Sequence, residues 1–407
     1  MIGKKKIKDT VYSLTDAARK AVWGCRTAIR NFRKRHTPDI VKEYRALAAK
    51  KGSRLARQEL LGRMKEKLLR PLRKMTVKRQ MKKGGEAPLV SFILPVYNVE
   101  PYLRQAMDCL LEQSLRHIEI ICVDDGSTDN SLEILRWYEQ KDSRVRVFTQ
   151  KNQFAGVARN LGLSKATGEY VCFLDPDDFF ERTLAEDTYF TAKVDRADIV
   201  VFSAMYYDNT EQTFREAPEL FQKKYVPKKR VFNRADCPDY LYMMTSPCTW
   251  NKLFRRQFVL DEKLLFQDIH NSNDLYFTFC ALAMAERIVV LDKVLTYYRI
   301  GVQTSLQATK DAHPLCTYEA CKALHNTLKE RGLLEQVRRS FVNTALPCCT
   351  SLWRKQTDPE KKQQMARFLT ETAFPELEVT GHERRYYIHK WCYHEMQVIL
   401  GNETLRS

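Results

Sequence analysis

The stretch Leu174-Asp175-Pro176-Asp177-Asp178 decides how the rest of the chain is interpreted. It follows a short apolar run, residues 170–174, whose aromatic and β-branched residues are typical of a buried strand. The three carboxylates therefore lie where a predicted strand leaves its sheet. Crowded carboxylates repel one another, and a divalent cation such as Mg²⁺ or Mn²⁺ relieves that repulsion. Taken alone, the stretch fits an acidic turn better than a metal site.

Strands and helices alternate around this stretch. Near-continuous apolar runs predict strands, and apolar positions three and four apart predict helices. We expect strands at residues 89–94, 118–123, 145–148, 171–174 and 198–202, and helices at residues 99–113, 131–139 and 156–165. Strands that are apolar on both faces and alternate with helices indicate an α/β fold with a mostly parallel sheet between helices.

Each of the first four predicted strands ends in polar residues. Ligands of such sheets bind at the carboxyl ends of the strands, so the polar clusters should converge at one edge. The clusters are Pro95-Val96-Tyr97-Asn98, Asp124 to Asp129, Lys151-Asn152 with Gly156 to Asn160, and the acidic stretch. Their convergence favours a site for a nucleotide and a metal over an isolated turn.

A nucleoside diphosphate sugar would use these residue types. Tyr97 can stack on a base, and Asp125 can accept a hydrogen bond from the base or the ribose. Arg159 offers a cationic fork to the base or a phosphate. Asp175 can reach ribose hydroxyls, and Asp177 can hold a metal that neutralises the leaving diphosphate. Each residue also has a structural alternative, because Tyr97 fits a core, Asp125 can cap a turn and Arg159 can pair with a nearby acid.

In their order and spacing, the motifs resemble those of the family-2 glycosyltransferases, inverting enzymes of the GT-A fold. The resemblance covers residues 89–305 and rests on Val90 to Asn98, Val123 to Asp129, Gly156 to Asn160, Gly168-Glu169-Tyr170 and Phe173 to Asp178. It implies transfer of a sugar from a nucleotide sugar, often a uridine diphosphate sugar, to a hydroxyl of a polysaccharide or glycolipid. By resemblance, Asp125 contacts the base, Asp175 the ribose and Asp177 a Mn²⁺ or Mg²⁺ ion. The implied nucleotide-binding set further includes Pro95, Tyr97, Asn152 and Arg159.

The acceptor half departs from the family pattern at one position. Inversion in a single displacement needs a base that takes the proton of the acceptor hydroxyl. The family places this base in a Glu-Asp pair at the start of a helix, and here the pair is Asn273-Asp274. Asp274 keeps the position of the base, although it also fits an acid that favours a helix N-terminus. The missing Glu leaves open a catalytically inactive scaffold that binds a nucleotide sugar.

Three further residues are candidates for the site by resemblance. Trp250 and Lys252 lie in a matched stretch and are candidate contacts to the acceptor or sugar, although Trp250 fits a protein core equally well. Arg299 follows Tyr297-Tyr298 and is a candidate clamp on the diphosphate. A nucleotidyltransferase is less consistent with the sequence, because residues 95–98 lack a Gly-rich basic loop.

The basic charge is concentrated at the N-terminus. Residues 1–85 hold 27 Lys and Arg against 6 Asp and Glu, a net charge of +21, while the remainder carries −3. Apolar residues at helical spacing over 11–32 and 61–75 predict basic amphipathic helices. Such helices can lie on an anionic membrane, pack on protein, or bind nucleic acid. We favour the membrane, and we expect no nucleic acid because the core is weakly acidic.

The pattern divides the chain into three predicted regions. Residues 1–87 form the basic helical segment, and residues 88–305 form the transferase domain, with a nucleotide-sugar half (88–204) and an acceptor half (205–305). Residues 306–407 carry helical patterns that can pack on the domain, shape the acceptor site or form a homo-oligomer. Cysteines scattered in apolar runs and the lack of a signal peptide or bilayer-spanning run indicate a cytoplasmic protein, peripheral to the inner membrane face.

Overall fold

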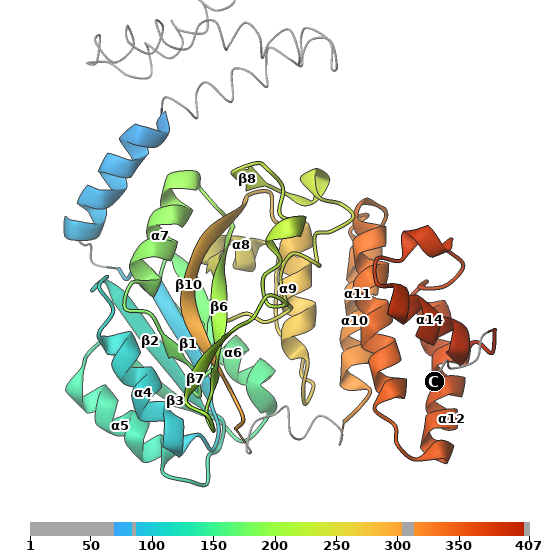
Figure 1. The fold of residues 1–407 in the computed structure, drawn as a ribbon. Helices are drawn as coiled ribbons and strands as arrows, with labels where there is room; N and C mark the ends of the chain where they lie inside the picture. Colours follow the sequence, from blue (N-terminus) through green and yellow to red (C-terminus); the bar gives the residue numbers. More distant parts are fainter. Residues whose placement is uncertain (1–68, 84–86, 303–312, 403–407) are drawn as a thin grey trace, which may run out of the picture. The chain divides into compact units, whose positions relative to one another are not determined.

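The computed structural model describes residues 69–83, 87–302 and 313–402 (Figure 1). The chain divides into two compact units, Met1–Lys82 and Lys83–Ser407. The described part of the first unit is helical, and its apolar residues Leu72 and Met75 are exposed. The amphipathic pattern predicted for residues 11–32 and for the start of the second helix lies outside the described residues. No helix within the described ranges is long and apolar enough to cross a bilayer.

A ten-stranded sheet forms the centre of the second unit, in the order β3-β2-β1-β4-β9-β6-β10-β5, with β7 beside β6 and β8 beside β10. The five predicted strands are confirmed as β1 (Val90–Val96), β2 (Ile118–Asp124), β3 (Val145–Thr149), β4 (Tyr170–Phe173) and β6 (Ile199–Asp208). The others are β5 (Phe179–Phe180), β7 (Thr213–Glu216), β8 (Val231–Phe232), β9 (Lys252–Arg255) and β10 (Ile288–Ile300).

The mostly parallel arrangement predicted for the sheet is confirmed for β3, β2, β1 and β4 and for the long pair of β6 and β10. Strands β3, β2, β1 and β4 are parallel neighbours. Strand β9 runs antiparallel to both β4 and β6, and the short strands β5, β7 and β8 also pair antiparallel. The half that carries the four polar strand ends is therefore parallel, and the half beyond β4 is mixed.

The three predicted helices are confirmed as α4 (Glu100–Leu111), α5 (Ser131–Lys141) and α6 (Phe154–Lys165). Helices α4 and α5 pack together beside β2 and β3, and α6 packs on β1 and β2 (Figure 1). Helix α6 lies close against β1, because a Cβ atom on Gly162 of the helix would lie 2.4 Å from Cγ2 of Ile93 on the strand. The remaining helices of residues 88–305 are α7 (Leu184–Asp195), α8 (Arg256–Asp261) and α9 (Asn273–Met284), with short 3₁₀ turns η1 (Lys223–Tyr225) and η2 (Arg234–Asp236).

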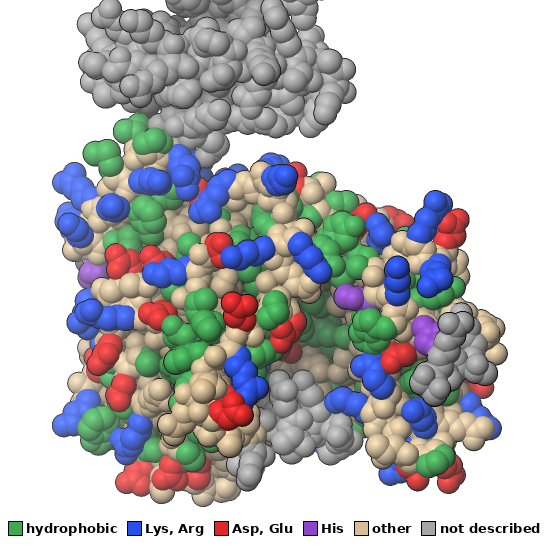
Figure 2. Space-filling view, in the orientation of Figure 1, with side chains coloured by type: hydrophobic (Ala, Val, Ile, Leu, Met, Phe, Trp, Pro, Cys, Tyr) green, Lys and Arg blue, Asp and Glu red, His purple; other side chains and the backbone are tan. Residues whose placement is uncertain are grey.

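The C-terminal region is helical, as predicted, and shares one hydrophobic core with the sheet. Its elements are α10 (Cys316–Glu330), α11 (Leu334–Arg354), α12 (Pro359–Phe368), η4 (Leu369–Ala373), α13 (Phe374–Glu376), η5 (Arg384–Tyr386) and α14 (Lys390–Ile399). The core runs from Phe173 of β4 through Phe277 of α9 to Phe341 of α11. Burial of large apolar side chains along this path stabilises the docked helices. Figure 2 shows a hollow between the sheet and these helices. On the face shown, the helices carry many Lys and Arg side chains.

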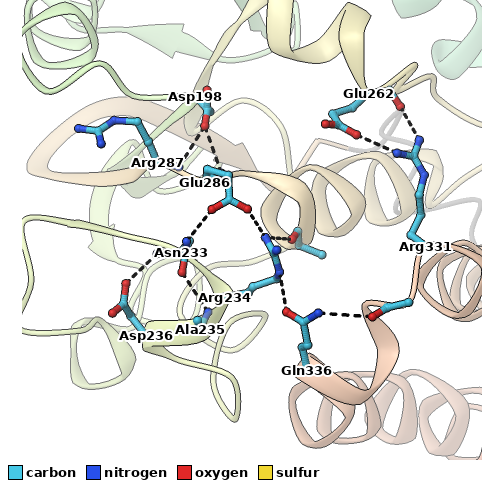
Figure 3. A network of polar contacts seen from close by, with 12 residues as sticks. Asp198, Asn233, Arg234, Ala235, Asp236, Glu262, Glu286, Arg287, Arg331 and Gln336 are labelled. Carbon is cyan, nitrogen blue, oxygen red and sulfur yellow. Dashed lines mark hydrogen bonds and ion pairs between the residues drawn. The ribbon is translucent and has the colours of Figure 1, made fainter. Parts of the chain in front are cut away.

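Polar contacts reinforce the docking of the C-terminal helices (Figure 3). The guanidinium of Arg234 donates to Glu286 at 2.7 Å and to Gln336 of α11 at 2.9 Å. A second contact joins Arg331, after α10, to Glu262 at 2.9 Å. These contacts join α10 and α11 to η2 and to the residues that follow α8 and α9, so they hold the C-terminal helices against residues 205–305.

Candidate active site

The four strand ends meet at one edge of the sheet, as the parallel registers require. Val96 of β1 is paired with Asp124 of β2, which is paired with Thr149 of β3. The loops that follow are joined by Asn98, whose Oδ1 accepts hydrogen bonds from the backbone N–H groups of Thr128 (2.7 Å) and Asp129 (3.3 Å). The polar clusters predicted to converge therefore line one edge.

The two acids that end β2 have different surroundings. Asp124 builds the turn, because its Oδ2 accepts from the N–H groups of Gly126 and Ser127, and Gly126 has a φ of +77°. Asp125 is 3% exposed, and its Oδ1 accepts from Nε2 of Gln150 (2.7 Å) and N–H of Gln153 (2.9 Å). Burial raises the pKa of Asp125 above its ordinary value, and these hydrogen bonds oppose that effect.

The other residues expected around the nucleoside differ in exposure. Tyr97 is 46% exposed, so its ring is open to a stacking partner. Asn152 is also exposed, in the loop between β3 and α6. Pro95 is buried within β1, where it is paired with Val123. Pro95 therefore lies in the strand beneath the edge, whereas Tyr97 and Asn152 lie on the surface.

Arg159 connects the loop after β4 to the start of α9. It lies on α6, is 7% exposed, and donates from Nη2 to Oδ1 of Asp175 at 2.6 Å. Its Nη1 donates to Oδ1 of Asn273 at 2.8 Å, and its guanidinium lies 5.5 Å from the ring centre of Phe266. The pairing with a nearby acid, which the sequence left open, is thus present in this structure.

The acids of the loop after β4 are crowded and partly desolvated. Burial, and then the charge of Asp175, raise the pKa of Asp177 to about 6. Asp178 is fully buried, and burial followed by the charge of Asp177 raises its pKa as well. Its Oδ1 accepts from the backbone N–H of Arg299 at 2.8 Å, while its Oδ2 has no hydrogen-bond partner.

These acids fit the chemistry of a divalent cation. The carboxylate oxygens are the donors that Mg²⁺ and Mn²⁺ prefer, and a cation would oppose the burial and the charge of Asp175 that together raise the pKa of Asp177. Within the described ranges, no cluster of three or more His, Cys, Asp or Glu side chains forms a complete metal site. A cation at this loop would take its remaining ligands from water or from a bound phosphate group, as is typical of Mg²⁺.

Arg299 supports the acidic loop from β10. Its Nε donates to the carbonyl of Asp177 at 2.8 Å, and its two terminal nitrogens donate to Asn209 (2.8 Å) and Gln105 (2.6 Å). The guanidinium also lies 4.8 Å from the ring centre of Tyr102. Arg299 is 7% exposed, and the N–H groups of its guanidinium are bonded within the protein, where they hold the acidic loop in place.

Asp274 lies in the first turn of α9, where a negative charge is favoured by the helix dipole. The residue before the helix, Ser272, has a left-handed backbone with φ of +60°, and its Oγ is 2.9 Å from Oγ1 of Thr317 on α10. The approach of α6 to this loop is close, because a Cβ atom on Gly156 would lie 2.3 Å from the carbonyl oxygen of Gln267. The start of α9 is therefore set by its neighbours on α6 and α10.

Sequence reasoning assigned no role to several residues that position Asp274. The side chain of Asn160 exchanges hydrogen bonds with both backbone groups of Phe266, at 2.8 and 2.9 Å. Gly156 and Asn160 belong to a quoted motif, so the sequence contained a signal for them. Ser272 and Thr317 gave none, because 45 residues separate two side chains that meet only in the fold.

Trp250 and Lys252 are in the interior. Trp250 is 4% exposed and stacks on Tyr298 with ring centres 5.2 Å apart. Lys252 is fully buried, and its Nζ donates to the carbonyls of Ser246 (3.0 Å) and Cys248 (2.7 Å). Burial lowers the pKa of Lys252 to about 8. In this structure both side chains are packed and bonded within the protein, on the side of the fold that carries the acceptor half.

Comparison with known proteins identifies a family. The profile of the family described as "Glycosyl transferase family 2" matches residues 91–259. An uncharacterized glycosyltransferase of Haemophilus influenzae is 54% identical over 237 residues, which are 57% of this chain and 86% of that protein. The uncharacterized glycosyltransferase EpsJ of Bacillus subtilis is 32% identical over 247 residues, which are 59% of this chain and 70% of that protein.

A solved structure also resembles the fold. The crystal structure of S. aureus TarS 1-349 in complex with UDP-GlcNAc matches with a TM-score of 0.48 and 20% identity. The match covers 77% of this chain and 92% of that chain.

Proposed function

Because the chain belongs to glycosyltransferase family 2, we propose that it transfers a sugar from a nucleoside diphosphate sugar, with uridine diphosphate sugars as the leading candidates, to a hydroxyl of a polysaccharide or glycolipid. The observation that carries the proposal is the pair of hydrogen bonds of Arg159. They join Asp175, on the nucleotide side, to Asn273, beside the candidate base Asp274. A donor bound at the strand ends would thus have its sugar next to Asp274.

The nucleotide is proposed to bind along the edge of the parallel half-sheet. The exposed ring of Tyr97 would stack on the base, and Asp125 would accept a hydrogen bond from it. Asp175 would accept hydrogen bonds from ribose hydroxyls while Arg159 keeps its carboxylate oriented. Asn152, exposed after β3, would contact the same nucleotide.

A divalent cation, Mn²⁺ or Mg²⁺, is proposed to be held by Asp177. When bound, it would neutralise charge that develops on the leaving diphosphate. The raised pKa of Asp177 supports this position, because a cation stabilises the carboxylate form that burial and Asp175 disfavour. Arg299 would act through the backbone of Asp177, by holding this loop in place.

Inversion is proposed to occur in a single displacement with Asp274 as the base. The carboxylate of Asp274 would take the proton of the acceptor hydroxyl as that oxygen attacks the anomeric carbon. The first turn of α9 favours the ionised carboxylate before the proton arrives. Thr317 and Ser272 would keep the start of the helix in register with the donor.

The test is titration calorimetry of UDP, GDP, CDP and ADP, each with and without Mn²⁺, followed by transfer assays with the nucleotide sugars of the bases that bind. We expect one nucleotide to bind preferentially, with an affinity that Mn²⁺ increases. The configuration of the product, determined by NMR, should be inverted. Absence of binding of every nucleotide would refute the proposal, and metal-dependent binding without transfer to any acceptor would favour the scaffold alternative.

The N-terminal segment is proposed to bring the enzyme to the inner face of the membrane. The net charge of +21 over residues 1–85 supports attraction to anionic lipid, at about 1 kcal/mol for each basic residue near the surface. The exposed Leu72 and Met75 of the described helix add apolar contact. Removal of residues 1–85 should release the protein from phosphatidylserine vesicles. Retention on the vesicles after this deletion would contradict the proposal.

A further inference from the structure

A polar cavity lies beside the entry to the helix that carries Asp274. Its volume is about 300 Å³, within the usual range of ligand pockets. It is formed by segments far apart in the sequence: the loop before α9, the start of α10, the end of α11 and the start of α12. The residues that matter to the argument are Asn271, His313, Thr317, Lys355, Asp358 and Lys361.

The charges around this cavity favour an anionic ligand. Lys355 and Lys361 contribute two ammonium groups, and Asp358 is the one acid among the lining residues that the structure describes. The carboxylate of Asp358 is the N-cap of α12, where its Oδ1 accepts from the backbone N–H of Lys361 at 2.8 Å. The Lys and Asp side chains of the lining therefore carry a net charge of +1. Amide and hydroxyl groups of the lining supply partners for sugar hydroxyls.

The cavity is coupled directly to the entry of α9. Thr317, which lines it, is hydrogen-bonded to Ser272, and Nδ2 of Asn271 donates to the carbonyl of His313 at 3.4 Å. Asn271 lies three residues before Asp274, so their Cα atoms are at most about 11 Å apart. A ligand in the cavity would therefore lie within a short distance of the proposed base.

Stacked rings connect the cavity to the nucleotide side as well. The ring of His313 stacks on His270 with centres 4.0 Å apart, and His270 contacts Phe154 at 4.7 Å. Phe154 follows Gln153, whose backbone N–H donates to Asp125. The rings thus form a continuous wall from the loop that is bonded to Asp125 to the cavity.

We propose that this cavity binds an anionic saccharide unit of the acceptor, carrying a phosphate or a carboxylate, and thereby presents a hydroxyl of the acceptor to Asp274. The assignment rests on the proposed glycosyl transfer and adds the chemical class of its acceptor. Lys355 and Lys361 bind the anionic group, and Thr317 contacts a hydroxyl of the same unit. The donor diphosphate is not the ligand of this cavity, because its proposed contacts lie at the acidic loop.

The test compares three probes by titration calorimetry with the full-length protein: N-acetylglucosamine 6-phosphate, glucuronate and uncharged glucose. The double variant Lys355→Gln/Lys361→Gln removes both charges. Lys362→Gln is the matched control, because Lys362 neighbours Lys361 but lies over the ring of Trp353, outside the lining. We expect the wild type and Lys362→Gln to bind at least one anionic probe about tenfold more tightly than glucose, and the double variant to lose that preference.

The outcomes distinguish a phosphate from a carboxylate on the acceptor. They also distinguish failure of the cavity assignment from failure of the proposed transfer reaction. Preference for the sugar phosphate alone identifies a phosphorylated acceptor, and preference for glucuronate alone identifies a uronic acid. Equal binding of all three probes by the wild type, or equal weakening by the control, overturns the assignment. Affinity for UDP with Mn²⁺, measured on the same proteins, should not change in the double variant. A protein that binds the anionic probes but no nucleotide would refute the transfer reaction and leave the cavity as an anionic-saccharide site.

Discussion

Replacement of Asp177 by Asn should stabilise the metal-free protein at neutral pH while removing metal-dependent nucleotide binding. Burial and the neighbouring Asp175 raise the pKa of Asp177 from 3.8 to about 6. At 1.36 kcal/mol per pKa unit, this shift corresponds to about 3 kcal/mol of destabilisation when the carboxyl is ionised. The side chain is partly exposed, so solvent screening reduces the expected effect to about 2 kcal/mol, or about 4 °C in Tm.

The sign of the pH dependence follows from the direction of the shift. The folded protein binds more protons than the unfolded chain between pH 3.8 and about 6, so the contribution of Asp177 to stability falls as pH rises through this window. Asn does not titrate. The difference in Tm between Asp177→Asn and wild type should therefore grow from pH 4.5 to pH 7 and remain constant above that.

Differential scanning calorimetry in the presence of a chelator, at several pH values, measures this difference. Asp175→Asn is the comparison in the same loop. It removes an ion pair with Arg159 at 2.6 Å and also a charge that raises the pKa of Asp177, so it should reduce the pH dependence of Tm between pH 4.5 and pH 7. Addition of Mn²⁺ and UDP should raise the Tm of wild type and not that of Asp177→Asn. Equal Tm values at pH 8, or a difference independent of pH, would refute the reasoning.

Four further substitutions test the positions of the site. Asp274→Asn should lower kcat by at least about 100-fold with unchanged nucleotide affinity, and retention of the transfer rate would exclude Asp274 as the base. Asn273→Glu places a negative charge beside Asp274, so the acidic limb of the pH–rate profile should move to higher pH. Gly156→Ala forces a Cβ atom against the carbonyl of Gln267. It should therefore lower stability by about 2 kcal/mol, measured by thermal denaturation, and reduce kcat, measured by transfer assays. Arg299→Ala removes the donors that hold the acidic loop, so it should lower stability by about 3 kcal/mol and weaken metal-dependent UDP binding. An unchanged UDP affinity would show that Arg299 does not act in the site.

The parallel half of the fold could be predicted because each of its strands forms a local apolar run. Strands β1 to β4 and helices α4 to α6 follow patterns of about five to twelve residues, and the rule for strand ends then brings their loops together. Strand β9 could not be placed in this way, since its insertion between β4 and β6 depends on contacts with strands more than 50 residues away in sequence. Sequence periodicity contains no information on such pairings.

The site shows the same division between local and distant information. The motif around Arg159 was evident in the sequence, but its contact with Asn273, 114 residues later, was not. The burial of Lys252 was also not apparent, because a lysine is rarely buried unless the fold supplies acceptors. Here two carbonyls and the side chain of Asn251 supply them. These acceptors lie in the loop directly before β9, so the lysine is satisfied by neighbours that only the folded loop brings to its ammonium group.

The three acids of the loop could not be distinguished from sequence, yet their partners in the fold differ. Asp175 is paired with the guanidinium of Arg159, and Asp178 accepts the backbone N–H of Arg299. Asp177 lies between them, and its pKa is raised because burial and the charge of Asp175 outweigh the two nearby guanidinium groups. A carboxylate that is disfavoured in this way gains most from an added cation. The same arrangement therefore supports Asp177 as the metal ligand. It also predicts that the ionised carboxylate of Asp177 lowers the stability of the metal-free protein, so a single titration of Tm against pH and Mn²⁺ tests the metal ligand and the destabilisation together.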